Sequence, residues 1–91
     1  MASYSLQIKP SAAKELSALP KKDRARVVGK IQGLATDPRP KGCERLSGHD
    51  LYRIRQGDYR ILYTLNDAAL LVLIYKIGHR REVYQIGRAH V

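Results

Sequence analysis

Three strand-like segments joined by two short turns fill the second half of this chain, and they constrain its fold more than any other feature. The segments are residues 51–56, 59–65 and 68–77, and the turns are Gly57-Asp58 and Asn66-Asp67. Glycine, asparagine and aspartate are typical of the tight turns between neighbouring antiparallel strands. The pattern predicts a β-meander that ends at Gly78, and the apolar run 68–77 is predicted to be its most buried strand.

The first half of the chain is predicted to form one strand and two helices. Residues 4–9 alternate large and polar side chains, as in a half-buried strand. Apolar residues then recur at helical spacing, first at Ala12, Leu16 and Leu19, and after Pro20 at Val27, Ile31, Leu34 and Ala35. A loop at 37–42, with two prolines and a glycine, precedes the meander. We expect a single α+β domain over residues 1–91, with two N-terminal helices packed on a small antiparallel sheet.

The composition is that of a small and strongly basic protein. Its 91 residues include 17 Lys and Arg against 8 Asp and Glu, for a formal net charge of +9. This length leaves room for one modest core and excludes a large multi-step enzyme. The single cysteine, Cys43, excludes an internal disulfide and has no partners at zinc-ligand spacing, and no apolar run is long enough to span a membrane. We therefore expect a cytoplasmic protein with a polyanionic partner, which is a nucleic acid, an anionic membrane surface or an acidic protein.

Three arginines are predicted to share one face of the meander. Because side chains alternate along a strand, Arg53 and Arg55 lie on the face opposite Tyr52 and Ile54. A two-residue turn after this strand places Arg60 directly across from Arg55. Like charges in such positions destabilise a sheet, and no acidic residue is expected on this face. The cluster is either a solvated sheet face or a phosphate-binding surface, and the net charge favours the second, since guanidinium groups bind phosphate oxygens in pairs.

Further candidates lie after the last strand and on the second helix. Directly after Gly78 come His79, Arg80, Arg81 and Tyr84. The end of a strand can deliver these residues to the edge of the sheet, although Tyr84 is alternatively an aromatic anchor and His79 an ordinary surface residue. The stripe of Lys22, Arg26 and Lys30 at intervals of four is either a solvated helix face or, with Arg45 and His79, a surface that docks on RNA or the ribosome.

Four motifs follow one another in the second half of the chain: LSG at 46–48, LYRIR at 51–55, GDYRILY at 57–63 and IGHRREVY at 77–84. With the preceding strand and helices, this ordered set resembles the RelE/ParE superfamily of bacterial and archaeal toxins. The resemblance implies a microbial RNase-like fold and a cognate antitoxin that neutralises the toxin. RelE-type members cut mRNA in the decoding site of the ribosome, whereas ParE-type members act on DNA gyrase and generally lack the catalytic set.

The resemblance to RelE implies a catalytic set formed by Arg53, Arg55, Arg60, Arg80 or Arg81, and Tyr84. The two strand positions hold Arg where RelE has Lys, and a shorter segment before Tyr84 leaves Arg80 and Arg81 as alternatives. In such a site the 2′-hydroxyl attacks the scissile phosphate and gives a 2′,3′-cyclic phosphate without metal or cofactor, while arginines stabilise the developing charge. Tyr84 is the predicted base, because nearby guanidiniums favour phenolate. His79 is a candidate acid, and Arg80 or Arg81 is a candidate donor to the leaving group.

These observations together predict a RelE-type mRNA endonuclease that works on the ribosome, in the cytoplasm of a bacterium or archaeon. Its predicted partners are a RelB-like antitoxin and mRNA, with operator DNA bound only indirectly through the antitoxin complex, and no membrane. Two alternatives stay open. The chain is otherwise a ParE-like gyrase inhibitor without nuclease activity, or an inactive member that binds only its antitoxin and, with it, operator DNA.

Overall fold

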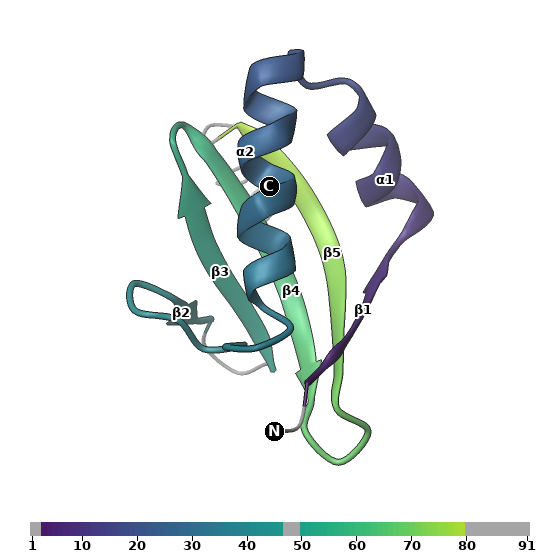
Figure 1. The fold of residues 1–91 in the computed structure, drawn as a ribbon, viewed down its shortest axis with the longest axis vertical. Helices are drawn as coiled ribbons and strands as arrows, with labels where there is room; N and C mark the ends of the chain where they lie inside the picture. Colours follow the sequence, from purple (N-terminus) through teal and green to yellow (C-terminus); the bar gives the residue numbers. More distant parts are fainter. Residues whose placement is uncertain (1–2, 47–49, 80–91) are drawn as a thin grey trace, which may run out of the picture.

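The protein folds as a five-stranded sheet with two helices packed against it (Figure 1). The computed structural model describes residues 3–46 and 50–79. In chain order the elements are β1 (Ser5–Ile8), α1 (Pro10–Ser17), α2 (Lys21–Gly33), β2 (Glu44–Arg45), β3 (Leu51–Gln56), β4 (Tyr59–Asn66) and β5 (Leu71–His79). The strand order is β1-β5-β4-β3-β2, with β1 parallel to β5 and the other neighbours antiparallel. The predicted α+β class is confirmed, and the sheet is mixed because of β1.

Each helix follows a residue in extended conformation and turns its apolar side to the sheet. Pro10 occupies the first turn of α1, where a missing N–H costs no hydrogen bond, and Pro20 immediately precedes α2 with a φ of −53°. Ala12 and Val27 are completely buried, and Leu34 is 1% exposed. In Figure 1, α2 crosses in front of β3 and β4, while α1 lies beside β5. The helices therefore cover one face of the sheet, and neither helix covers the other face.

Alternation along β3 and β4 separates the two faces. Tyr52 and Ile54 of β3 pair with Tyr63 and Ile61 of β4, and all four belong to the core under the helices. Leu62 alternates with them and lies outside this core, although it is only 2% exposed. The longest buried run, residues 60–63, lies on β4 rather than on the predicted strand β5, because β4 is central in the sheet.

The first strand is more exposed than its alternating sequence predicts. Leu6 is 36% exposed and Ile8 is 38% exposed, so the expectation of a half-buried strand is wrong. The reason is topological, since β1 is an edge strand that pairs on one side only, with β5.

The loop between β4 and β5 is longer than the predicted two-residue turn, so β5 begins at Leu71 rather than at residue 68. The side-chain oxygen of Asn66 accepts a hydrogen bond from the backbone N–H of Ala69 at 3.0 Å, and Leu70 adopts a φ of 51°. These local contacts hold the apolar residues 68–70 in a turn. At its other end β5 continues through Gly78 to His79, where a break was predicted.

Candidate functional site

The three arginines predicted from the sequence lie on the face of the sheet opposite the helices. Arg55 and Arg60 are direct cross-strand partners, as predicted from a two-residue turn. Gly57 in that turn has a φ of 60°, a left-handed conformation that glycine adopts without strain. Arg53 lies two residues before Arg55 on β3 and therefore shares this face. We refer to Arg53, Arg55 and Arg60 as the arginine face.

The exposure of the arginine face changes from one residue to the next. Arg55 is exposed, the side chain of Arg53 is 15% exposed, and Arg60 is 5% exposed. Arg60 lies on the central strand opposite Gly78 of β5, and glycine presents no side chain there, which leaves room for the long side chain of Arg60. The face thus combines one arginine held within the sheet surface with one that is open to solvent.

β2 brings a carboxylate onto the arginine face, which corrects the prediction that no acidic residue lies there. Glu44 is the cross-strand partner of Arg53, and Arg53 Nη2 donates a hydrogen bond to Glu44 Oε1 at 2.9 Å. The pKa of Glu44 lies below its ordinary value, because this hydrogen bond and the charge of Arg53, followed by the charges of Arg55 and Arg60, favour the carboxylate. All three guanidinium groups act on one carboxylate, so they form one electrostatic cluster.

Lys30 of α2 lines a hollow at the edge of β3 together with Arg55 of the arginine face. The hollow has a volume of about 240 Å³, and Glu44 and Arg55 also line it. β2 pairs only with Tyr52 and Arg53 of β3, so the edge of the sheet beyond them is open. Lys30 and Arg55 therefore line the same hollow at this edge of the sheet.

Arg26 and His79 line a different hollow, of about 320 Å³, between α2 and the β3–β4 turn. His79 pairs with Tyr59 in the sheet, and their rings meet edge to face with centroids 6.0 Å apart. Tyr59 donates a hydrogen bond to Asp23 Oδ2 of α2 at 3.2 Å. These residues therefore lie on the helix side of the sheet, and the sheet separates them from the arginine face.

Lys22 and Arg45 also lie away from the arginine face. Lys22 is exposed on the first turn of α2. Arg45 pairs with Tyr52, whose ring faces the helices, and its Nη2 forms an ion pair with Asp50 Oδ1 at 3.0 Å. Of the five residues predicted to dock on RNA or the ribosome, Lys30 alone lines a hollow together with a member of the arginine face, Arg55.

Three members of the predicted catalytic set, Arg80, Arg81 and Tyr84, lie outside the described residues. Their proposed roles, including the choice between Arg80 and Arg81, stay predictions. The last described residue, His79, pairs with Tyr59, next to Arg60 on β4. The described part of β5 therefore ends next to the strand residue that precedes Arg60.

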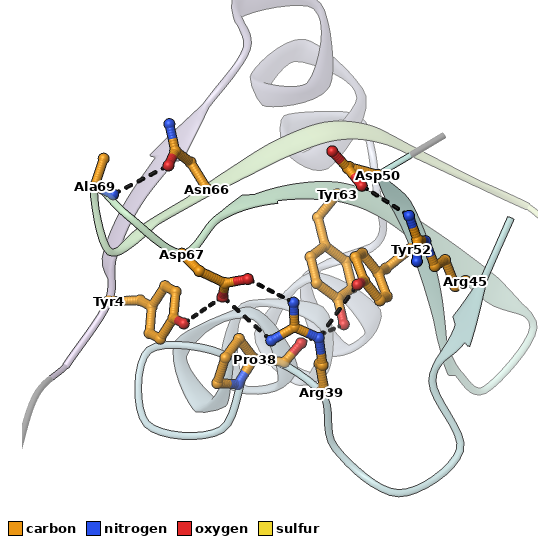
Figure 2. Close-up of polar contacts among 10 residues, drawn as sticks. All are labelled: Tyr4, Pro38, Arg39, Arg45, Asp50, Tyr52, Tyr63, Asn66, Asp67 and Ala69. Carbon is orange, nitrogen blue, oxygen red and sulfur yellow. Dashed lines mark hydrogen bonds and ion pairs between the residues drawn. The ribbon is translucent and has the colours of Figure 1, made fainter. Parts of the chain in front are cut away.

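A second polar cluster, which the sequence reasoning missed, fixes the loop that leads to β2 (Figure 2). Arg39 donates two hydrogen bonds to Asp67, from Nη1 to Oδ1 at 3.2 Å and from Nη2 to Oδ2 at 2.8 Å. Arg39 Nε donates a third to the hydroxyl of Tyr52 at 3.2 Å, and Tyr4 donates one to Asp67 Oδ1 at 2.5 Å. Hydrogen bonds from Arg39 and Tyr4 lower the pKa of Asp67 to about 2.

The same loop is also tied to the core by Tyr63. Its hydroxyl donates a hydrogen bond to the carbonyl oxygen of Pro38 at 2.7 Å, and its ring stacks on Tyr52 with centroids 5.6 Å apart. Burial raises the pKa of Tyr63, so the phenol stays protonated and keeps donating. The two prolines around Arg39 were the only sequence signal of a fixed loop. The cluster's visible role is to position this loop.

The described residues contain no group of three or more His, Cys, Asp or Glu side chains that is able to hold a metal ion. Among the same residues, no helix is both long and apolar enough to cross a membrane. Cys43 is a free, partly buried thiol.

Comparison with known proteins identifies the family. The family model of the ParE toxin of type II toxin–antitoxin systems, parDE, matches residues 6–84. The chain belongs to the RelE/ParE superfamily of toxins. A Methanocaldococcus jannaschii protein that carries the name RelE1 toxin is 30% identical over an alignment of 86 residues, which covers 90% of this chain and 96% of that protein. The resemblance predicted from the four motifs is thereby confirmed.

Solved structures of RelE proteins share the fold of this RelE/ParE toxin. The RelE–RelB complex of Pyrococcus horikoshii matches with a TM-score of 0.77 and 32% identity, over 85% of this chain and 94% of that chain. The toxin–antitoxin complex RelBE2 of Mycobacterium tuberculosis matches with a TM-score of 0.77 and 28% identity, over 88% of this chain and 94% of that chain. A mutant of E. coli RelE in the free state matches with a TM-score of 0.75 and 28% identity, over 93% of each chain.

Proposed function

We propose that this RelE/ParE toxin is a metal-independent endoribonuclease that cuts mRNA on the ribosome. The observation that carries the proposal is the convergence of Arg53, Arg55 and Arg60 on one sheet face, where all three act on the same carboxylate. Guanidinium groups keep their charge at every physiological pH and bind phosphate oxygens in pairs. A sheet surface with three of them is suited to hold a backbone phosphate, and relatives named RelE support RNA as the source of that phosphate.

The proposed reaction needs no external co-reactant. The 2′-hydroxyl oxygen forms a bond to the neighbouring phosphorus while the bond from phosphorus to the 5′-oxygen breaks. The products are a 2′,3′-cyclic phosphate and a 5′-hydroxyl, and the proton lost by the 2′-hydroxyl passes to Tyr84 as phenolate. A proton donor in the tail, Arg80 or Arg81, protonates the leaving oxygen. His79, the third predicted donor, lies on the helix side of the sheet and is separated from the arginine face. Arg53, Arg55 and Arg60 stabilise the negative charge that develops on the phosphate oxygens.

The proposed partners follow the same reasoning. Complexes of RelE with RelB have been solved for two relatives that are 28% and 32% identical to this chain. We expect a RelB-like antitoxin, with operator DNA bound only through that complex. An antitoxin that covers the arginine face would need acidic side chains, because the face itself carries three positive charges against Glu44. The place of action is the cytoplasm, where ribosomes are found.

The test is primer extension on mRNA that is being translated in a purified system with added toxin. Wild type should produce new 5′ ends within codons, whereas Tyr84→Phe and Arg55→Ala should each slow cleavage roughly 100-fold, as expected for loss of a base or of a charge-stabilising donor. Lys14→Gln, a change of charge on the exposed side of α1, is the control and should cut like wild type. Unchanged mRNA with wild-type toxin at every codon would reject the proposal.

The match to the ParE family model supports a second candidate, inhibition of DNA gyrase without nuclease activity. The two candidates differ in one pair of assays. Under this candidate the wild-type toxin blocks supercoiling of relaxed plasmid by gyrase and leaves mRNA on ribosomes intact. An active supercoiling reaction at toxin concentrations that cleave mRNA would remove gyrase as the target.

A further inference from the structure

The hollow beside the arginine face is lined by three positive side chains from three different elements. Lys30 comes from α2, Lys41 from the loop before β2, and Arg55 from β3, and the volume between them is about 240 Å³. Glu44 and Gly42 complete its polar wall, and Ile54 supplies the floor from the core side. Lys41 was not among the predicted site residues.

Within the described residues, these three cations are not engaged in ion pairs. Within residues 3–46 and 50–79, none of Lys30, Lys41 and Arg55 lies within 4.0 Å of a carboxylate oxygen, whereas Glu44 is paired with Arg53. Like charges gathered around one hollow repel each other, and an anion that enters relieves this repulsion. The size and charge of the hollow fit a phosphate group, which ammonium and guanidinium groups both bind.

The loop that carries Lys41 is held in place before any ligand arrives. Its start is fixed by Arg39, which is bound to Asp67, and its end by a hydrogen bond from Cys43 N to the carbonyl oxygen of Pro40 at 3.0 Å. Gly42 adopts a φ of 92°, a left-handed conformation that turns the chain back toward β2. Binding an anion at Lys41 therefore requires little ordering of the backbone.

The hollow is continuous with the arginine face, because Arg55 and Glu44 belong to both. A strand of RNA carries one phosphate per nucleotide. If its scissile phosphate lies on the arginine face, its neighbouring phosphates lie near the hollow. We propose that Lys30, Lys41 and Arg55 form a second phosphate subsite, which binds an RNA backbone phosphate adjacent to the reacting centre. This inference rests on the proposed function. The phosphate belongs either to the mRNA itself or to ribosomal RNA.

The test measures binding as a function of salt with the full chain. The first probe is a single-stranded 2′-O-methyl RNA, which cannot be cleaved because its 2′-oxygen is blocked, and binding is followed by fluorescence anisotropy from 50 to 200 mM KCl. Each lost phosphate contact should reduce the slope of log K against log salt by about 0.7, which is ~2.6-fold over this range. The variant is the double substitution Lys30→Gln and Lys41→Gln. The control is the double substitution Lys14→Gln and Lys21→Gln, which removes the same number of charges at exposed positions of α1 and α2. The second probe is co-sedimentation with ribosomes that carry no mRNA.

A lower slope with the oligonucleotide for the double variant, relative to two control charges removed at Lys14 and Lys21, supports the subsite and assigns it to mRNA. A loss confined to empty ribosomes supports the subsite and assigns it to ribosomal RNA. Equal slopes for the double variant and the controls in both assays overturn the inference, as does a wild-type protein that binds neither probe. Cleavage by the wild type on translating ribosomes is scored separately, so the subsite can fail while the proposed function stands. Thermal unfolding of each variant checks that the fold is retained.

Discussion

Glu44 offers the most direct test of how the arginine face binds a phosphate. Its carboxylate accepts a hydrogen bond from Arg53 at 2.9 Å and so occupies a position that a phosphate oxygen would take. When RNA displaces Glu44 from Arg53, the carboxylate gains a cation from solution at the same time as the phosphate loses one. The exchange releases no net counterion. We therefore expect that Glu44→Gln removes the carboxylate that competes with phosphate for Arg53, so that phosphate binding at Arg53 releases a counterion.

The size of the effect follows from one additional phosphate neutralised. For single-stranded RNA, one more contact makes the slope of log K against log salt about 0.7 more negative, so the affinity gain over wild type is ~2.6-fold larger at 50 mM than at 200 mM salt. Removing the carboxylate also removes its repulsion of phosphate near Arg55 and Arg60, since both lie close enough to lower its pKa. Both effects have the same sign, and the variant should bind more tightly than wild type at every salt concentration in this range.

The matched control is Asp50→Asn. Asp50 holds Arg45 at 3.0 Å, in an ion pair similar to that of Glu44 with Arg53 at 2.9 Å, and its removal adds the same single charge. Arg45, however, lies on the helix side of the sheet. Fluorescence anisotropy with a 2′-O-methyl oligonucleotide should show the steeper slope for Glu44→Gln and a wild-type slope for Asp50→Asn. Equal slopes for the two variants would mean that net charge alone governs binding, and weaker binding by Glu44→Gln would refute the reasoning.

Three further predictions concern the stability of the fold, and urea unfolding followed by circular dichroism measures each of them. The depressed pKa of Asp67, about 2, means that its bonds to Arg39 stabilise the fold above pH 4 and are lost as the pH falls toward 2, so Asp67→Asn should lack this part of the acid-induced loss. Tyr63→Phe removes the hydrogen bond to Pro38 and should cost about 1 kcal/mol. Ile61→Ala, at a completely buried position, should cost about 2–5 kcal/mol, against about 0.5–1.5 for Ile61→Val. An Asp67→Asn protein with the full acid response, or core and hydroxyl variants as stable as wild type, would contradict the assigned contacts.

The arginine face was predictable because local rules determine it. Side chains alternate along a strand, and a two-residue turn fixes the register of the two strands that it joins. These rules place Arg55 opposite Arg60, as the structure does. The same rules failed at the next hairpin, where Asn66 also looks like part of a two-residue turn. There the backbone N–H of Ala69 donates a hydrogen bond to the side chain of Asn66 and stabilises a longer loop. The apolar residues 68–70, which were predicted to be part of the strand, lie within this loop.

The positions of Glu44 and Lys41 could not be predicted from the sequence, because they depend on contacts between distant parts of the chain. β2 has two residues, too few to show a sequence period. Glu44 pairs with Arg53 because the preceding loop brings β2 alongside that part of β3. That loop is fixed by Arg39 and Asp67, which are 28 residues apart. No spacing rule connects such residues before the sheet exists. The exposed state of β1 has a similar cause, since its edge position follows from strand order.

The buried state of Arg60 bears on the two interpretations that the sequence left open for the arginine face. A solvated sheet face explains Arg55, which extends into water at little cost. It does not by itself account for Arg60, which is 5% exposed, because burying an arginine carries a desolvation cost that an exposed sheet face avoids. Placing Arg60 opposite Arg55 adds like-charge repulsion to that cost. Lysine at position 60 keeps the charge and removes the planar fork, so Arg60→Lys should retain the fold and lose cleavage under the phosphate-binding interpretation, whereas full activity would return the face to a structural role.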